Sequence, residues 1–155
     1  MNLRPLLGIA AMNLTLGACA HDTVPLNVVL DYGNCSGLSA GVREVTLDEV
    51  AKIRGMTMFG GDDTKAVDQA GMPKLIAISR GEQPTAGYSL SLKEGRVQEQ
   101  LLHVEVEWKI PATDAITAQM MSHPCLVLGL PDTAPSEVIV ATTEGEEIGR
   151  LTLTP

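Results

Sequence analysis

The sequence predicts a β-rich α+β fold, a small antiparallel β-sandwich or barrel-like domain with one short α-helix. Apolar and polar residues alternate over residues 97–110, and two apolar runs, 74–79 and 125–131, have the length of buried strands. Hydrophobic residues make up 45% of the 155-residue chain but aromatic residues only 3%, so the core must be aliphatic. This length suits one modest domain rather than two.

The elements are expected in a fixed order along a single β-rich domain at residues 26–155, after a short tether at residues 19–25. Hydrophobic periodicity and turn signals predict the following segments: a strand at 26–31, a helix at 46–53, strands at 74–79, 88–93, 97–110 and 125–131, and a closing hairpin that turns at Glu144-Gly145. The stretch at 54–73 is irregular. Thr46 and Glu49 form a capping box at the start of the helix. Glu94-Gly95 is interpreted as a hairpin turn.

Residues 1–18 have the layout of a secretory signal peptide. Arg4 gives a short basic region, and the apolar stretch that follows is too short to span a bilayer, which takes roughly 20 residues. The stretch ends in Leu16-Gly17-Ala18-Cys19, which resembles the lipobox of bacterial lipoproteins. We therefore expect cleavage before Cys19 and lipidation of its thiol. An ordinary secretory signal cut after Ala20 also fits the small residues there.

The charge of the chain limits its partners. The formal net charge is −8, and a negative protein repels the phosphates of nucleic acid. The sequence also contains no basic patch that would bind anionic lipid. Membrane attachment is therefore expected through the acyl chains alone. The residue after Cys19 is alanine rather than aspartate, which by the usual sorting rule predicts the outer membrane, with the domain facing the periplasm.

The two cysteines that remain after lipidation are expected to pair. An exported chain enters an oxidising compartment, so we predict a disulfide between Cys35 and Cys125. The alternative is a zinc site made by these cysteines with His103 and His123. The proline between His123 and Cys125 restricts their approach to one ion, so no metal and no cofactor are expected.

The stretch Gln83-Pro84-Thr85-Ala86-Gly87-Tyr88 joins two predicted strands. Pro84 has no amide hydrogen and interrupts strand pairing, Gly87 can take a positive φ, and Tyr88 starts the next strand with a large amphipathic ring. The stretch is either a corner of the fold alone or a corner displayed as part of a protein-binding surface. In the second interpretation Pro84, Thr85, Gly87, Tyr88 and Pro124 belong to that surface, with the loop at 111–124 beside the corner.

The corner, the long alternating strand and "TAQMMSHPCLVLGLP" together resemble the C-terminal domain of the protease complex subunit PrcB family. The resemblance covers about residues 74–141 and rests on Pro84, Thr85, Gly87, Tyr88, Pro124 and Pro131. Ala86 stands where the family pattern has glycine, and His123 where serine is more usual. The resemblance implies a non-catalytic subunit that associates with a surface peptidase and stabilises it.

A second resemblance concerns residues 83–88 alone. Chagasin-type cysteine peptidase inhibitors carry a similar N-P-T-T-G-[YF] loop on an immunoglobulin-like sandwich. Their second loop, R-P-[WF], has only His123-Pro124-Cys125 as a counterpart here, without the arginine or the aromatic residue. The resemblance implies direct inhibition of a peptidase as the alternative function.

An enzyme is the third class of function, and the sequence does not favour it. Ser, His and Asp occur in no recognised catalytic arrangement. Glu105 and Glu107 lie on the wet face of one strand, where they are expected to be solvated. The prediction is therefore a non-catalytic, exported accessory or binding subunit at the cell envelope, with an envelope protein, such as a peptidase, as its partner.

Overall fold

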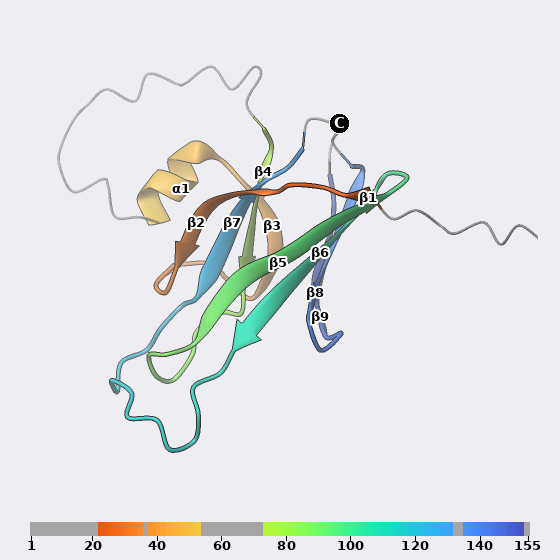
Figure 1. Ribbon diagram of the computed structural model, residues 1–155. Helices are drawn as coiled ribbons and strands as arrows, with labels where there is room; N and C mark the ends of the chain where they lie inside the picture. The colour runs from red at the N-terminus through yellow and green to blue at the C-terminus, as the bar shows by residue number, and fades with distance from the viewer. Residues whose placement is uncertain (1–21, 36, 54–72, 132–134, 154–155) are drawn as a thin grey trace, which may run out of the picture.

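In a computed structural model of the protein, the described residues form two β-sheets and one helix (Figure 1). The structure describes residues 22–35, 37–53, 73–131 and 135–153, so the predicted signal peptide and Cys19 lie outside it. Within these ranges no helix is long and apolar enough to cross a bilayer. The elements are β1 (Asp22–Thr23), β2 (Asn27–Tyr32), β3 (Gly41–Val45), α1 (Leu47–Ile53), β4 (Leu75–Ser79), β5 (Ser89–Gln98), β6 (Leu101–Lys109), β7 (Cys125–Gly129), β8 (Glu137–Thr142) and β9 (Glu147–Thr152).

The predicted β-rich fold with one short helix is confirmed, with one departure in topology. One sheet has the order β1-β5-β6-β8-β9 and the other the order β2-β7-β4-β3. All pairs are antiparallel except β6 and β8, which are parallel. The chain leaves the first sheet after β6, returns along β7 in the second sheet, and re-enters the first as β8. This crossover, which no local pattern in the sequence shows, makes β8 run in the direction of β6.

The apolar runs in β4 and β7 are explained by burial on both faces. Their inner faces pack against the other sheet in a core that includes Ile76, Ile78, Leu126 and Leu128. Their outer faces, with Ala77 and Val127, are covered by α1 and the segment after β2. A strand buried on both sides needs continuous rather than alternating apolar residues. By contrast, β6 alternates because only its inner face, with Leu102, Val104 and Val106, is buried.

The two sheets approach each other at their edges, and a glycine lies at each approach. Leu26, on the segment between β1 and β2, passes directly over Gly95 of β5. At the other edge, Val42 of β3 lies against Gly149 of β9. The register of each glycine's strand pair shifts beside it, at Leu92/Glu94 and at Val140/Ala141, as β-bulges do where a strand bends.

The predicted hairpin turn at Glu94-Gly95 is therefore wrong. The strand β5 continues through both residues to Gln98, and the turn falls at Glu99 and Gln100. Glu99 has a φ of 57°, which makes it the one non-glycine residue with a positive φ in the part of the chain described. Gly95 lacks a side chain because another segment passes over it, and not because the chain reverses there.

Helix α1 begins with the predicted capping box. The Thr46 amide donates to the Glu49 carboxylate at 2.8 Å, and the Glu49 amide donates to the Thr46 hydroxyl at 3.2 Å. The hydrogen bond from the Thr46 amide is the main reason why the pKa of Glu49 is lowered, and the Arg43 guanidinium lowers it further. The cap is therefore strongest when Glu49 is ionised.

Removal of the cap should cost about 1 kcal/mol of unfolding free energy at pH 7, which is typical of an N-cap Thr→Ala change. We expect this loss in Thr46→Ala, measured by urea unfolding. Because the folded-state pKa of Glu49 is lowered, its contribution is present above the ordinary value of 4.5 and is lost as the pH falls through the folded-state value. The stability difference between the wild type and Glu49→Gln should therefore shrink from pH 7 to pH 3. A difference that stays constant with pH would contradict this assignment.

Candidate functional site

The corner at residues 83–88 and the loop at residues 110–124 lie at the same end of the molecule, which we call the rim (Figure 1). Strand β4 ends there and β5 begins there, so the corner connects the two sheets. Strand β6 also ends there and β7 begins there, so the loop connects the same two sheets a second time. The rim is thus a double crossing between the sheets.

Hydrogen bonds join the corner and the loop into one unit. Gln83 and Ser122 form an antiparallel bridge, with amide-to-carbonyl bonds of 2.8 and 3.0 Å. The Ser122 hydroxyl donates to the Thr85 carbonyl at 2.7 Å, and the Ala86 amide donates to the Ala118 carbonyl at 3.2 Å. The predicted adjacency of the two segments is confirmed, and the buried Ser122 is the polar group that connects them.

The residues of the corner have distinct places in this unit. Pro84 and Gly87 are exposed, whereas Thr85 and Tyr88 are half-buried. Gly87 has a φ of +98°, and a Cβ there would lie 3.3 Å from both Pro111 Cβ and Thr117 Cγ2 of the loop. The predicted positive φ at Gly87 is confirmed, and the close approach of the loop gives it a second reason to be glycine.

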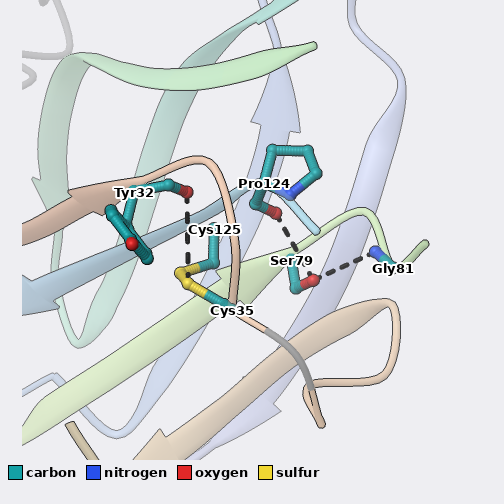
Figure 2. The surroundings of a disulfide bond; sticks show 6 residues. All are labelled: Tyr32, Cys35, Ser79, Gly81, Pro124 and Cys125. Carbon is teal, nitrogen blue, oxygen red and sulfur yellow. Dashed lines mark hydrogen bonds between the residues drawn. A yellow bond between two sulfur atoms is a disulfide. The ribbon is translucent and has the colours of Figure 1, made fainter. Parts of the chain in front are cut away.

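Two expectations about neighbouring residues need correction or comment. Pro124 was predicted as a member of the binding surface, but its side chain is fully buried, so it shapes the rim without being displayed on it. Its carbonyl accepts a bond from the Ser79 hydroxyl, and the same hydroxyl accepts from the Gly81 amide (Figure 2). Ala86, which replaces the glycine of the family pattern, has an ordinary φ.

The predicted disulfide between Cys35 and Cys125 is present and fixes the root of the loop (Figure 2). Both cysteines are fully buried, with their Cα atoms 5.9 Å apart. Beside them the Cys35 amide donates to the His123 carbonyl at 2.7 Å, and the His123 amide donates to the Gly33 carbonyl at 3.1 Å. The end of the loop is therefore held covalently and by hydrogen bonds to the segment after β2.

An aromatic pair lies just inside the rim. The rings of Tyr88 and Trp108 stack with centroids 5.5 Å apart and an interplanar angle of 27°. The Arg80 guanidinium lies 5.2 Å from the centre of the Trp108 ring and donates to Glu146 at 2.8 Å. Trp108 is the only tryptophan of the chain, and Tyr88 is one of two tyrosines. Tyr, Trp and Arg are the residues that most often dominate protein interfaces.

Comparison with protein-family models matches residues 74–131 to the family described as PrcB C-terminal. We call residues 74–131 the PrcB C-terminal segment, after the family that they match. The match ends at Pro131, rather than at residue 141 as expected from the sequence. Comparison with curated proteins and with solved structures found no significant match.

The PrcB C-terminal segment contains the whole rim. It supplies β4 to β7, which are the two central strands of the four-stranded sheet and two neighbouring strands of the other. Tyr88, Trp108 and Arg80 are within it as well. The structural feature that the matched segment builds is thus the double crossing between the sheets, with the aromatic pair at its base.

The loop of the PrcB C-terminal segment also displays apolar side chains to solvent. Four of the six exposed large hydrophobic residues in the described part of the chain lie on it: Ile110, Ile116, Met120 and Met121. Ile116 is completely exposed. The strand predicted at 97–110 includes Ile110, but β6 ends at Lys109 and the Ile110 side chain is 61% exposed. Ile116, Met120 and Met121 lie in the loop predicted at 111–124 and were not singled out there. Three large apolar residues in a predicted surface loop are a sequence signal for an exposed apolar surface.

The predicted ligands of the alternative zinc site do not come together. His103 is exposed on the outer face of β6, and both cysteines are in the disulfide. His123 Nε2 lies 3.4 Å from a Glu82 carboxylate oxygen. In the described ranges no three His, Cys, Asp or Glu side chains are grouped so that they could hold a metal ion.

Glu105 and Glu107 remain on the wet face of β6. Glu107 pairs with Lys93 at 2.8 Å, and this bond is the main cause of its lowered pKa. A carboxylate that is exposed and neutralised by a neighbouring lysine is held in its charged form and serves poorly as a general acid. The rim, by contrast, combines exposed apolar side chains on its loop with a stacked aromatic pair.

Proposed function

We propose that this chain is a non-catalytic, exported lipoprotein that acts as an accessory subunit of a peptidase complex at the cell envelope. The proposal places the lipid on Cys19, the anchor in the outer membrane and the folded domain in the periplasm. The observation that carries it is the rim, which lies wholly in the PrcB C-terminal segment and exposes four large apolar side chains. A soluble domain rarely leaves such a cluster in water unless a partner covers it.

The bonds within the rim support a role as a binding surface, because they make the loop more than a mobile connection between two strands. The disulfide, the Gln83–Ser122 bridge and the Ser122–Thr85 bond hold the loop in one conformation. A rigid surface loses little conformational entropy when a partner binds it. Stabilisation of a peptidase requires no chemistry from this subunit, only a persistent contact that favours the folded partner.

The inhibitor alternative requires a second wedge beside the corner. The nearest sequence counterpart, His123-Pro124-Cys125, cannot provide one, since Pro124 is fully buried and Cys125 is bonded to Cys35. Tyr88 is also packed against Trp108 instead of projecting freely. We therefore expect no inhibition of a papain-like peptidase at low micromolar concentration. Inhibition that is lost in Tyr88→Ala would favour the inhibitor function over the accessory one.

The binding surface is tested by site-specific crosslinking in the native membrane. A photo-crosslinking amino acid at Ile116 should give one defined adduct with an envelope protein, whereas the same amino acid at Val28 should not. Val28 is a matched control because it is 44% exposed and lies on β2, away from the rim. Met120→Ser with Met121→Ser should lower the yield at Ile116 severalfold without altering the thermal unfolding midpoint. Equal adducts at Ile116 and Val28 would contradict the proposal.

The anchor is tested separately from the surface. Radiolabelled palmitate should be incorporated into the wild-type chain and not into Cys19→Ser, and the mature chain should begin at residue 19. A mature chain that begins at residue 21 and carries no lipid would instead indicate the ordinary secretory signal. That outcome would remove the membrane anchor and leave the crosslinking result unaffected.

A further inference from the structure

A groove opens between the two sheets at the rim end. It has a volume of about 490 Å³ and is bordered by the ends of β3, β4, β6 and β9. Its lining includes Arg80, Tyr88, Trp108, Ile110, Glu146 and Ile148, and we call it the mouth groove. The groove is distinct from the tip of the loop, because Ile116, Met120 and Met121 do not line it.

The apolar surface of the mouth groove is preorganised. Ile148 packs against the main core, and Trp108 contacts both the Tyr88 ring and the Arg80 guanidinium. Glu146 pairs with the same guanidinium at 2.8 Å. The exposed Ile110 extends the apolar surface outward. An apolar side chain that enters would therefore meet an ordered aromatic wall without first having to arrange it.

The charges around the groove are mostly negative. Glu146 and Glu147 line it together with Arg80, which pairs with Glu146 at 2.8 Å, and Arg150 pairs with Glu147 at 3.5 Å. Both carboxylates stay about half exposed, so each keeps oxygen surface that a further basic group can reach. Other exposed charged residues at the same end of the molecule are the acids Glu82, Asp114 and Glu144 and the base Lys109. Such a field attracts cations and steers a basic partner. It disfavours anionic lipid and a second copy of this chain, whose formal net charge is −8.

The position of the N-terminus also favours a partner protein over the anchoring membrane as the occupant of the groove. Asp22 of β1 pairs with Val97 at the far end of β5, whereas the rim begins at Ser89, eight residues earlier on the same strand. At ~3.3 Å per residue, the two ends of this strand are separated by roughly 25 Å. In Figure 1, β1 and the rim lie at opposite ends of β5. With lipid on Cys19, three residues before Asp22, the rim end would therefore face away from the bilayer.

We propose that the mouth groove binds a segment of a partner protein in which an apolar side chain is flanked by lysine or arginine. The apolar side chain lies against Trp108 and Tyr88, and the basic groups pair with Glu146 and Glu147. This inference rests on the proposed accessory function and names the chemistry that the partner presents. The apolar tip of the loop then contributes additional, less selective contact area.

The single tryptophan makes the groove directly observable. The full mature chain, in detergent micelles, is titrated with three peptides while the fluorescence of Trp108 is recorded. The peptides are acetyl-Gly-Arg-Leu-Arg-Gly-amide, its counterpart with both arginines replaced by glutamate, and its counterpart with leucine replaced by glycine. We expect a saturable change with the first peptide, and at least about tenfold weaker binding of the other two. Equal binding of all three, or no saturable change with any of them, would overturn the inference.

Variants of the protein separate the groove from the rest of the surface. Glu146→Gln with Glu147→Gln should weaken the arginine–leucine peptide severalfold and reduce its salt dependence. Glu44→Gln, an exposed acid on β3, is the control and should leave the affinity unchanged. Ile110→Ser should weaken binding of the same peptide without changing the fold, because the Ile110 side chain is already exposed. Equal affinity in all these variants would contradict the assignment to the groove.

Two further results distinguish this inference from the proposed function. If Ile116 yields a partner adduct and the Glu146/Glu147 variant leaves that adduct unchanged, the groove is not the recognition site and the accessory function stands. If Ile116 yields no adduct, the accessory function itself fails. A change in Trp108 fluorescence with phosphatidylglycerol vesicles but not with the basic peptide would make the occupant a lipid surface and overturn the inference.

Discussion

Replacement of both Cys35 and Cys125 by alanine will lower the free energy of unfolding by about 4 to 5 kcal/mol. The two cysteines are 90 residues apart in the sequence. A crosslink that closes a loop of this length removes a large conformational entropy from the unfolded chain, which gives this magnitude. Urea unfolding of the oxidised wild type and of the double alanine variant measures the difference. A loss below about 1 kcal/mol would contradict the role of the disulfide as the main constraint on this domain.

The same variant should also show a local effect at the rim. The disulfide adjoins Pro124, and Ser122 two residues earlier forms the bridge to Gln83. Without the covalent root, the Gln83 and Ser122 amides should exchange with solvent faster than those of the β5–β6 pair. Uniform acceleration across the sheets would mean that the disulfide stabilises the whole domain without specifically ordering the rim.

Gly95→Ala will lower the free energy of unfolding by about 1 to 3 kcal/mol, the usual range for an overpacked site. A Cβ at this position would lie 2.6 Å from Leu26 Cδ1 and 3.3 Å from the Val24 carbonyl oxygen. The Val24 amide donates to the Gly95 carbonyl at 2.9 Å, so the overlying segment cannot move away without loss of that bond. Thermal or urea unfolding of the variant measures the cost.

Gly33→Ala is the matched control for this substitution. Gly33 has no positive φ, and a Cβ there would meet nothing within 4 Å. Its unfolding free energy should stay within about 0.5 kcal/mol of the wild type. If both alanine variants lost the same stability, the effect would come from the backbone preference of alanine and not from the contact with Leu26.

The local features of this fold could be predicted because they depend on neighbouring residues. The capping box of α1 needs only Thr46 and Glu49, and the direction of the β6 side chains follows from their alternation. The disulfide followed from the number of cysteines and the predicted export of the chain. The adjacency of corner and loop followed from their positions on either side of the same strands.

The remaining features depend on contacts between distant segments, which no local pattern records. Glu94-Gly95 was interpreted as a turn because glycine before a second strand pattern has that meaning in most hairpins. The actual reason for Gly95 is Leu26, which is far from it in the sequence. The parallel pairing of β6 with β8 and the convergence of Arg80 on Trp108 likewise require the completed topology. The mouth groove could therefore not be predicted from the sequence.

The most direct test of the binding surface is amide hydrogen exchange of the full mature chain, alone and with the partner captured at Ile116. The account predicts slower exchange in the complex at residues 83–88 and 110–122, with little change in α1 and β2. Helix α1 covers the outer face of the four-stranded sheet and β2 is an edge strand of that sheet, so they serve as internal controls. Protection confined to α1 or β2, with the rim unchanged, would contradict the claim that this end of the molecule binds the partner.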